Sequence, residues 1–275
     1  MKLIFDCGST KCTIVHTSTK NEYIDHTTVE GFNPVLHTSI ESATYNHFYS
    51  LLSGRFFDIN TIVYCGAGCI NKNTNSQVQK GLLKIFPESK VDIYSDLEFL
   101  GHILEINERS IIGILGTGSN SGLWDKNRIV KNNISGGYLL GDEGSAYVLG
   151  KKLLINYLRG NLNSTSSHLI ENKINLNQNQ IIQEIYSTSF PNRLIASYAA
   201  LFPHIDDPMK DEILNDSFGE YIEKRILPLS DGVSIIHLFG SVAYFNLQYL
   251  KPLLEKVNLQ IGLISRGPLD LFINK

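Results

Sequence analysis

Short apolar runs that end in glycine-containing turns divide the chain into alternating strands and helices. A run of about five apolar residues bounded by turn residues is typical of a buried strand, whereas apolar residues spaced roughly 3.6 apart indicate a helix. The first half of the chain therefore has the predicted order β-β-β-α-β-α-β-α. The predicted strands are 3–5, 12–16, 22–30, 61–65 and 91–94, and the predicted helices are 42–52, 76–86 and 96–104.

The second half repeats this order more loosely. Its predicted strands are 110–115, 121–125, 128–132, 234–239 and 259–264, and its predicted helices are 143–159, 241–257 and 268–273. A polar, Asn-rich insertion at 161–180 leads to further helices that continue to about 227. Three sequential strands followed by alternating helices and strands predict a mixed sheet covered by helices.

This internal duplication predicts the fold class and the domains. We expect an α/β protein of the actin-like, ribonuclease-H-like architecture, in which two βββαβαβα lobes face a central cleft. The N-terminal lobe is expected at 1–108, completed by a C-terminal helix at about 266–275. The C-terminal lobe is expected at 109–265, with a helical insertion at about 161–230.

Two glycine-containing hairpins about a hundred residues apart are candidate nucleotide-binding segments. Residues 6–11 (DCGSTK) and 116–120 (GTGSN) each follow an apolar strand and open the next one. Small residues in such turns let backbone amides approach a phosphate closely. The pattern suggests two halves of a clamp that closes over one ligand.

Composition and charge narrow the function classes. The formal charge is 24 minus 27, or −3, and no basic run marks a nucleic-acid or anionic-membrane partner. Only three apolar residues follow Lys2 before Asp6, and no apolar run approaches ~18 residues, so we expect a cytoplasmic protein. The oligomeric state is left open, a homodimer included.

The four cysteines do not form a known metal or disulfide pattern. Cys7, Cys12, Cys65 and Cys69 match neither a secreted disulfide framework nor a double CxxC zinc site, so reduced thiols are expected. Around the turn at 65–69 we expect small buried residues rather than a metal site.

Four segments, in order, resemble the motifs of N-acetylglucosamine kinases within the BadF/BadG/BcrA/BcrD-type ATPase group. They are residues 6–11, 116–120, 135–146 (SGGYLLGDEGSA) and 239–243 (FGSVA). The resemblance implies a kinase that uses ATP and Mg²⁺ to phosphorylate the 6-hydroxyl of N-acetylglucosamine. The chain is shorter than the animal enzymes, and it lacks the Cys-rich zinc motif of the ROK sugar kinases. Its cysteine placement also differs from that of the iron–sulfur dehydratase activators.

The resemblance also implies site residues. The residues implied for ATP are Asp6, Gly8, Ser9, Thr10, Lys11, Gly116, Thr117, Gly118, Ser119, Gly240 and Ser241. Among them, Thr10 and Thr117 would lie at the phosphates, and Gly240 and Ser241 near the adenosine. The residues implied for the sugar are Asn33, Asp96, Asn120, Gly136, Gly137 and Asp142.

Each acidic candidate also has a simpler interpretation. Asp6 ends a strand, where a carboxylate could hold Mg²⁺ directly or through water, although Asp is common in turns. Asp96 and Asp142 each precede or open a predicted helix and could be N-caps. In the functional interpretation, Asp96 would accept the proton of the sugar hydroxyl and Asp142 would bind sugar hydroxyls. Lys11 could reach a phosphate or could simply be solvated.

Two other functions stay open. Within enzymes, the substrate could be glucosamine or N-acetylmuramic acid. From another class, the chain could be an activator that is switched by ATP and phosphorylates no sugar. Release of ADP with and without sugar would distinguish the two classes.

Overall fold

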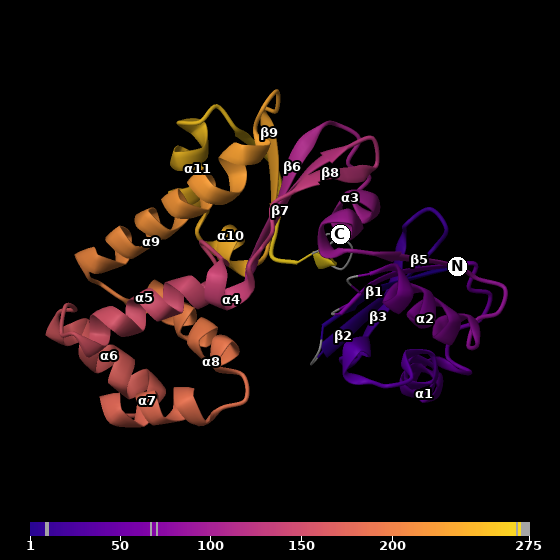
Figure 1. The fold of residues 1–275 in the computed structure, drawn as a ribbon, viewed down its shortest axis with the longest axis horizontal. Coiled ribbons are helices and arrows are strands. Elements are labelled where there is room, and N and C mark those ends of the chain that lie inside the picture. Colours follow the sequence, from indigo (N-terminus) through magenta and orange to yellow (C-terminus); the bar gives the residue numbers. More distant parts are fainter. Residues whose placement is uncertain (9–10, 67, 70, 268, 271–275) are drawn as a thin grey trace. The chain divides into compact units, whose positions relative to one another are not determined.

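The computed structural model describes residues 1–8, 11–66, 68–69, 71–267 and 269–270, and it divides into two compact units (Figure 1). The first unit is Met1–Ile106 together with Gly267–Lys275, and the second is Asn107–Arg266. The predicted terminal helix at 268–273 lies mostly outside the described residues. Among the described residues, no helix has both the length and the apolar character needed to cross a membrane.

A five-stranded mixed sheet with the order β3-β2-β1-β4-β5 forms the centre of the first unit. Its strands are β1 (Lys2–Cys7), β2 (Lys11–Thr17), β3 (Tyr23–Glu30), β4 (Thr61–Gly66) and β5 (Lys90–Tyr94). β2 is antiparallel to both β1 and β3, whereas β4 is parallel to both β1 and β5. The ends of β1, β3, β4 and β5 therefore lie along one edge of the sheet.

Helices cover both faces of this sheet, as the alternation of buried side chains along β1 requires. Phe5 packs in a cluster with side chains of α1 (Ile40–Leu52) and α2 (Lys72–Leu83), whereas Ile4 packs with α3 (Asp96–Ile103). A short 3-10 helix, η1 (Pro34–Leu36), follows β3. The first unit is thus a three-layer α/β structure.

The second unit repeats the sheet. Its order is β10-β9-β6-β7-β8, which is the order of the first sheet with β6 in the place of β1. The strands are β6 (Ser110–Leu115), β7 (Ser119–Asp125), β8 (Arg128–Asn132), β9 (Ile235–Phe239) and β10 (Gln260–Ser265). The predicted duplicated α/β fold is confirmed in its two mixed five-stranded sheets.

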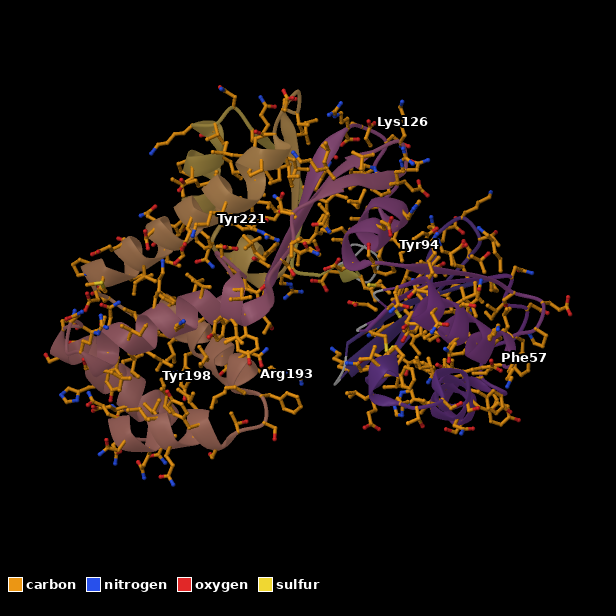
Figure 2. The ribbon with its side chains drawn as sticks, viewed as in Figure 1. Phe57, Tyr94, Lys126, Arg193, Tyr198 and Tyr221 are labelled. Carbon is orange, nitrogen blue, oxygen red and sulfur yellow. The ribbon has the colours of Figure 1, made fainter. Side chains whose placement is uncertain are left out.

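The helices of the second unit are more numerous and pack on one another as well as on the sheet (Figure 1). They are α4 (Gly137–Leu140), α5 (Ala146–Leu158), α6 (Ser164–Ile174), α7 (Gln178–Ser187), α8 (Pro191–Ser197), η2 (Tyr198–His204), α9 (Pro208–Tyr221), η3 (Ile222–Ile226), η4 (Leu227–Leu229), α10 (Ser241–Phe245) and α11 (Leu247–Glu255). Leu149 and Leu153 of α5 share a core with Ile111 of β6. Tyr221 is fully buried inside this unit (Figure 2).

Some predicted helices have different bounds, and local capping explains the start of α2. α2 begins at Lys72 rather than at 76, because the Asn71 side chain accepts a hydrogen bond from the amide of Thr74 at 2.9 Å. The helix predicted at 241–257 is broken at Asn246 into α10 and α11. The insertion at 161–180 contains all of α6 and the start of α7, each capped by an asparagine.

Two helical glycines provide a matched test of the packing. A Cβ on Gly81 in α2 would lie 2.6 Å from Cβ of Thr44 and 2.7 Å from the carbonyl oxygen of Glu41, both on α1. A Cβ on Gly219 in α9 would meet nothing within 4 Å. Gly81→Ala is expected to lower stability by about 1–2 kcal/mol through overpacking. Gly219→Ala is expected to raise it by about 0.5–1 kcal/mol, because alanine favours the helix.

Thermal melts of the two variants check this expectation. Equal melting temperatures for Gly81→Ala and Gly219→Ala would contradict the close approach of α1 and α2.

Candidate active site

The first unit gathers three of the predicted acidic and amide residues along one edge of its sheet. Asp6 is near the end of β1, Asn33 follows β3 and Asp96 follows β5. The carboxylates of Asp6 and Asp96 both lie close enough to Cys65, near the end of β4, to add to the effect of burial in raising the pKa of its thiol. Parallel strands place these residues together because their carboxyl ends meet at the same edge.

The hairpin after β1 is closed by a backbone hydrogen bond. The amide of Gly8 donates to the carbonyl of Lys11 at 2.8 Å. Ser9 and Thr10, which the resemblance assigns to the ATP phosphates, lie outside the described residues. Burial raises the pKa of Asp6, and the charge of Lys11 opposes this increase. A partly buried carboxylate beside a turn that could bind phosphate is suited to binding a cation.

Asp96 is not the N-cap of α3. Ser95 is the capping residue, since its hydroxyl accepts from the amide of Glu98 at 3.4 Å. Asp96 is the first helical residue, and its Oδ1 accepts from the amide of Leu97 at 2.8 Å. The N-cap interpretation of Asp96 is therefore wrong, and its role as a base stays a prediction.

Asn33 is held at the start of η1. Its Oδ1 accepts from the amide of Val35 at 3.3 Å and lies directly against Gly68, where a Cβ would collide with it. The preceding residue, Phe32, donates its amide to the carbonyl of Gly8 at 3.1 Å. The Asn33 segment is thus tied to both the hairpin after β1 and the turn after β4.

In the second unit, the turn between β6 and β7 is attached to the start of α5. The amide of Gly116 donates to the carbonyl of Gly118 at 2.9 Å, which closes the turn. The first amides of α5 also donate to it: Ala146 to the carbonyl of Gly116 at 2.8 Å, and Tyr147 to the carbonyl of Thr117 at 3.2 Å. Thr117 therefore has a fixed backbone position.

Asp142 also contacts this turn. Its Oδ1 accepts from the amide of Ser119 at 3.1 Å, and a Cβ on Gly118 would lie 2.8 Å from its Oδ2. α5 begins at Ala146 rather than at 143, and Ser145 caps it by accepting from the amide of Val148 at 3.3 Å. The N-cap interpretation of Asp142 is therefore also wrong.

Burial raises the pKa of Asp142, while the amide of Ser119 and the charge of Arg225 oppose this increase. Its backbone adopts φ 59°, a left-handed conformation that is uncommon outside glycine. Strained backbone of this kind at the end of a glycine-rich turn is frequently associated with a binding site.

Gly136 is the N-cap of the short helix α4 and Gly137 is its first residue, and both have positive φ, 71° and 63°. The ring of Tyr138 in α4 packs edge-on against Tyr147 of α5, with centroids 5.3 Å apart. The Gly-Gly turn is thereby connected to the same helix start as Asp142. Asn120 lies on β7, where its Oδ1 accepts from the amide of Ser121 at 2.9 Å.

Gly240 joins the ends of three strands. Its amide donates to the carbonyl of Ser265, at the end of β10, at 2.9 Å. With φ 106°, it passes so close to the carbonyl of Leu115, at the end of β6, that a Cβ would collide with it. Ser241 then begins α10 beside the turn that contains Thr117.

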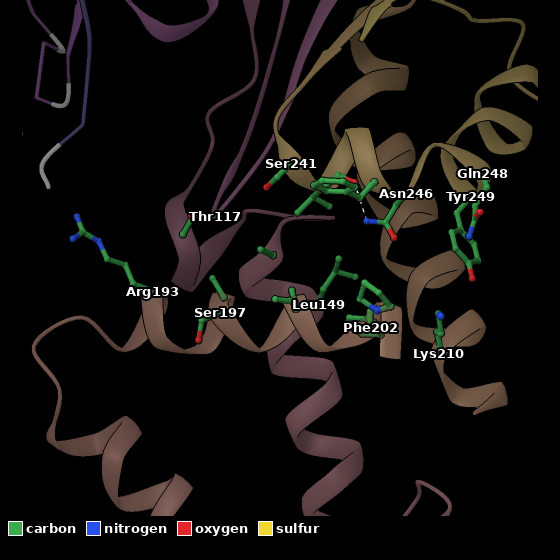
Figure 3. Close-up of a pocket in the computed structure, with 17 residues that line it drawn as sticks. Thr117, Leu149, Arg193, Ser197, Phe202, Lys210, Ser241, Asn246, Gln248 and Tyr249 are labelled. Atoms are coloured by element: carbon green, nitrogen blue, oxygen red, sulfur yellow. Dashed lines mark hydrogen bonds between the residues drawn. The ribbon is translucent and has the colours of Figure 1, made fainter. Parts of the chain in front are cut away.

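A cavity of about 670 Å³ lies within the second unit (Figure 3). In that view Thr117, Ser241 and Arg193 lie at one end, and Lys210, Gln248 and Tyr249 lie at the other. The structure thus brings together two residues that the resemblance assigned to ATP. The remaining lining residues are Ala146, Leu149, Ala196, Ser197, Ala199, Ala200, Phe202, Pro203, Val242, Phe245 and Asn246.

Most of the cavity wall was not predicted from the sequence. Arg193 comes from α8 (Figures 2 and 3) and Lys210 from α9 (Figure 3), within the segment where the resemblance is weak. The Nδ2 of Asn246 donates to the carbonyl of Val242 at 2.9 Å, at the break between α10 and α11. No short motif marks these residues, because they meet only when separate helices pack together.

Comparisons with known proteins show which solved structures have a similar fold. No protein-family model matches the chain, and no curated protein matches it. A solved structure from Porphyromonas gingivalis, provisionally described as an N-acetylglucosamine kinase, is 26% identical over 100% of this chain and 98% of its own, with a TM-score of 0.88. A protein from Chromobacterium violaceum with the same provisional description is 16% identical over 97% of this chain and 94% of its own, with a TM-score of 0.70.

A ROK family glucokinase from Streptomyces griseus, solved with glucose and AMPPNP, is 11% identical, with a TM-score of 0.61. The similarity covers 97% of this chain and 96% of the glucokinase chain. Along its whole length the chain therefore has the actin-like fold of the sugar kinases, and it resembles the N-acetylglucosamine kinases, as its four motifs predicted.

Proposed function

We propose that this protein is a cytoplasmic, ATP-dependent sugar kinase that phosphorylates the 6-hydroxyl of N-acetylglucosamine. The main support is the position of its four motifs in two units of the same topology: three lie at the ends of β1, β6 and β9, and the fourth, 135–146, leads into α5. The full-length similarity to the Porphyromonas gingivalis protein supports the amino sugar, and the glucokinase fold supports a sugar kinase more generally.

The cavity of the second unit is the proposed adenosine site. Its volume suits a nucleoside, and its wall is largely apolar with a few polar groups, as in most cofactor sites. Thr117 and Ser241 lie at the end where the glycine-containing turn would meet the phosphates, and Arg193 adds a positive charge there (Figure 3). Positive charge and backbone amides are the groups that stabilise a transferring phosphoryl group.

The residues present fit Mg²⁺ only if the nucleotide phosphates supply further ligands to the ion. Within the described part of the chain, no group of three or more His, Cys, Asp and Glu side chains could hold a metal by itself. Mg²⁺ usually binds through one or two carboxylates together with substrate phosphates. Asp6, whose carboxylate is partly buried, would provide that carboxylate. The ion would neutralise charge on the phosphates.

In the proposed reaction, the sugar 6-hydroxyl oxygen forms a bond to the γ-phosphorus of ATP, and the bond from that phosphorus to the bridging oxygen breaks. ADP leaves with the electron pair, and the hydroxyl proton passes to the carboxylate of Asp96. Asp142, Asn33, Asn120 and the Gly136–Gly137 turn are proposed to bind the sugar.

Release of ADP tests this function. The wild-type protein is expected to release ADP when N-acetylglucosamine is added and to release little without sugar. Asp96→Asn is expected to lower kcat by about 10²–10⁴-fold, the contribution typical of a general base. Glu98→Gln, two residues further along α3, is the control and should retain kcat.

Two results would count against this proposal. ADP release that no amino sugar stimulates would contradict the kinase and favour the nucleotide-switched activator. A folded Asp96→Asn variant with wild-type kcat would remove Asp96 from the mechanism. Stimulation by glucosamine or N-acetylmuramic acid instead would retain the kinase and change its substrate.

Variants of Asp142 and Ser145 distinguish a role in sugar binding from a role in helix capping. Asp142→Ala is expected to weaken N-acetylglucosamine binding about 10- to 100-fold, because hydrogen bonds to a charged group contribute ~1.5–3 kcal/mol. Ser145→Ala should instead lower stability by ~0.5–2 kcal/mol, as for the loss of an N-cap. Calorimetric titration and a thermal melt of both variants measure the two effects. Unchanged sugar affinity in Asp142→Ala would rule out the assignment.

The adenosine site can be tested by filling the cavity. Ala200 is exposed and lines the cavity, so Ala200→Trp is expected to weaken ADP binding by at least about tenfold. His204 is exposed at the end of the same 3-10 helix and is not a lining residue, so His204→Trp is the matched control. Equal affinity of the two variants for ADP would place the nucleotide elsewhere.

A further inference from the structure

Arg225 is a buried arginine that no sequence motif marked. It lies in the π-helical turn η3, and only 4% of its surface is exposed. Taking a guanidinium group out of water is unfavourable unless hydrogen bonds and opposite charge compensate for it. The partners of Arg225 therefore indicate what its burial achieves.

The guanidinium holds the segment that precedes the Gly136–Gly137 turn. Its Nη1 donates to the carbonyl of Ile134 at 2.5 Å, and its Nη2 donates to the carbonyl of Asn133 at 3.3 Å. The backbone of Arg225 adds a third link, since its carbonyl accepts from Nδ2 of Asn133 at 2.9 Å. The same carbonyl accepts from the hydroxyl of Ser121 on β7 at 2.9 Å.

The guanidinium also faces the segment that contains Asp142. Its Nε lies 3.9 Å from Oε2 of Glu143, and both side chains are largely buried, with 5% and 17% of their surfaces exposed. Glu143 directly follows Asp142, whose pKa the positive charge of Arg225 lowers in opposition to burial. One side chain thus contacts both segments that the resemblance assigned to the sugar.

We propose that Arg225 is a positioning residue for the sugar site. It holds the 133–137 segment and the Asp142–Glu143 segment in one arrangement, so that the glycine turn and the Asp142 carboxylate meet the sugar together. This inference rests on the proposed function for the identity of the ligand. The arrangement itself can be measured without any ligand.

The guanidinium fork makes this role specific to arginine. Its planar set of donors can reach two carbonyls and a carboxylate at once, whereas a lysine ammonium is a single point charge. Arg225→Lys therefore retains the charge that faces Asp142 and Glu143 but cannot reproduce the pair of hydrogen bonds to the 133–134 carbonyls. The adjacent Lys224 pairs with Glu220 on the helix surface and provides the matched control.

Two measurements on Arg225→Lys test the proposal. Steady-state kinetics should show a KM for N-acetylglucosamine raised at least about tenfold and a KM for ATP within about twofold of wild type. Amide hydrogen exchange of residues 133–138 should be faster than in wild type, with neither ligand present. Lys224→Gln should change neither quantity.

Asn133→Ala is a second variant that removes only one hydrogen bond to Arg225, from a partly exposed side chain. It should raise the sugar KM about three- to tenfold, and it replaces Arg225→Lys if that variant does not fold. Unchanged sugar KM and unchanged exchange in a folded variant would overturn the proposal. If the wild type used no sugar, the proposed function would fail, and exchange alone would still decide whether Arg225 holds the segment.

Discussion

The close approach of Gly240 to the carbonyl of Leu115 is the contact on which the second unit depends. It brings the end of β9 against the end of β6, while the amide of Gly240 is bonded to the end of β10. Any Cβ at this position would separate the three strand ends. The turn with Thr117 and the start of α10, which Gly240 brings together, both line the cavity.

The strands were predictable because their pattern is local. Each buried strand is a short apolar run that ends in turn residues, so ten strands could be located from neighbouring residues alone. Helix starts were harder, because several polar residues compete for one cap. In the stretch from Gly141 to Ser145, the left-handed backbone of Asp142 and Gly144 delays the helix, and Ser145 becomes the cap.

The candidate site was predictable only where it lies at strand ends. Asp6 and the turn at 116–120 belong to motifs, Asp96 follows a predicted strand, and the placement of all three follows from the sheet topology. The cavity wall depends instead on distant packing: Gly150 of α5 lets the backbone of α8 approach near Ile195, which brings Ala196 and Ala200 to the cavity. Arg225 left one weak signal in the sequence, a charge four residues after Tyr221 and directly before the apolar pair Ile226 and Leu227.

Under the proposed function, phosphate binding and base binding depend on different parts of the chain. The turn that would meet the phosphates comes from the duplicated core, whereas much of the wall that would meet the base comes from residues 193–210, which have no counterpart in the first unit. Sequence change in that stretch can reshape the cavity without altering the register of either sheet. Under the proposed function, the preference for one nucleotide base over another can therefore change while the turn proposed to bind the phosphates stays the same.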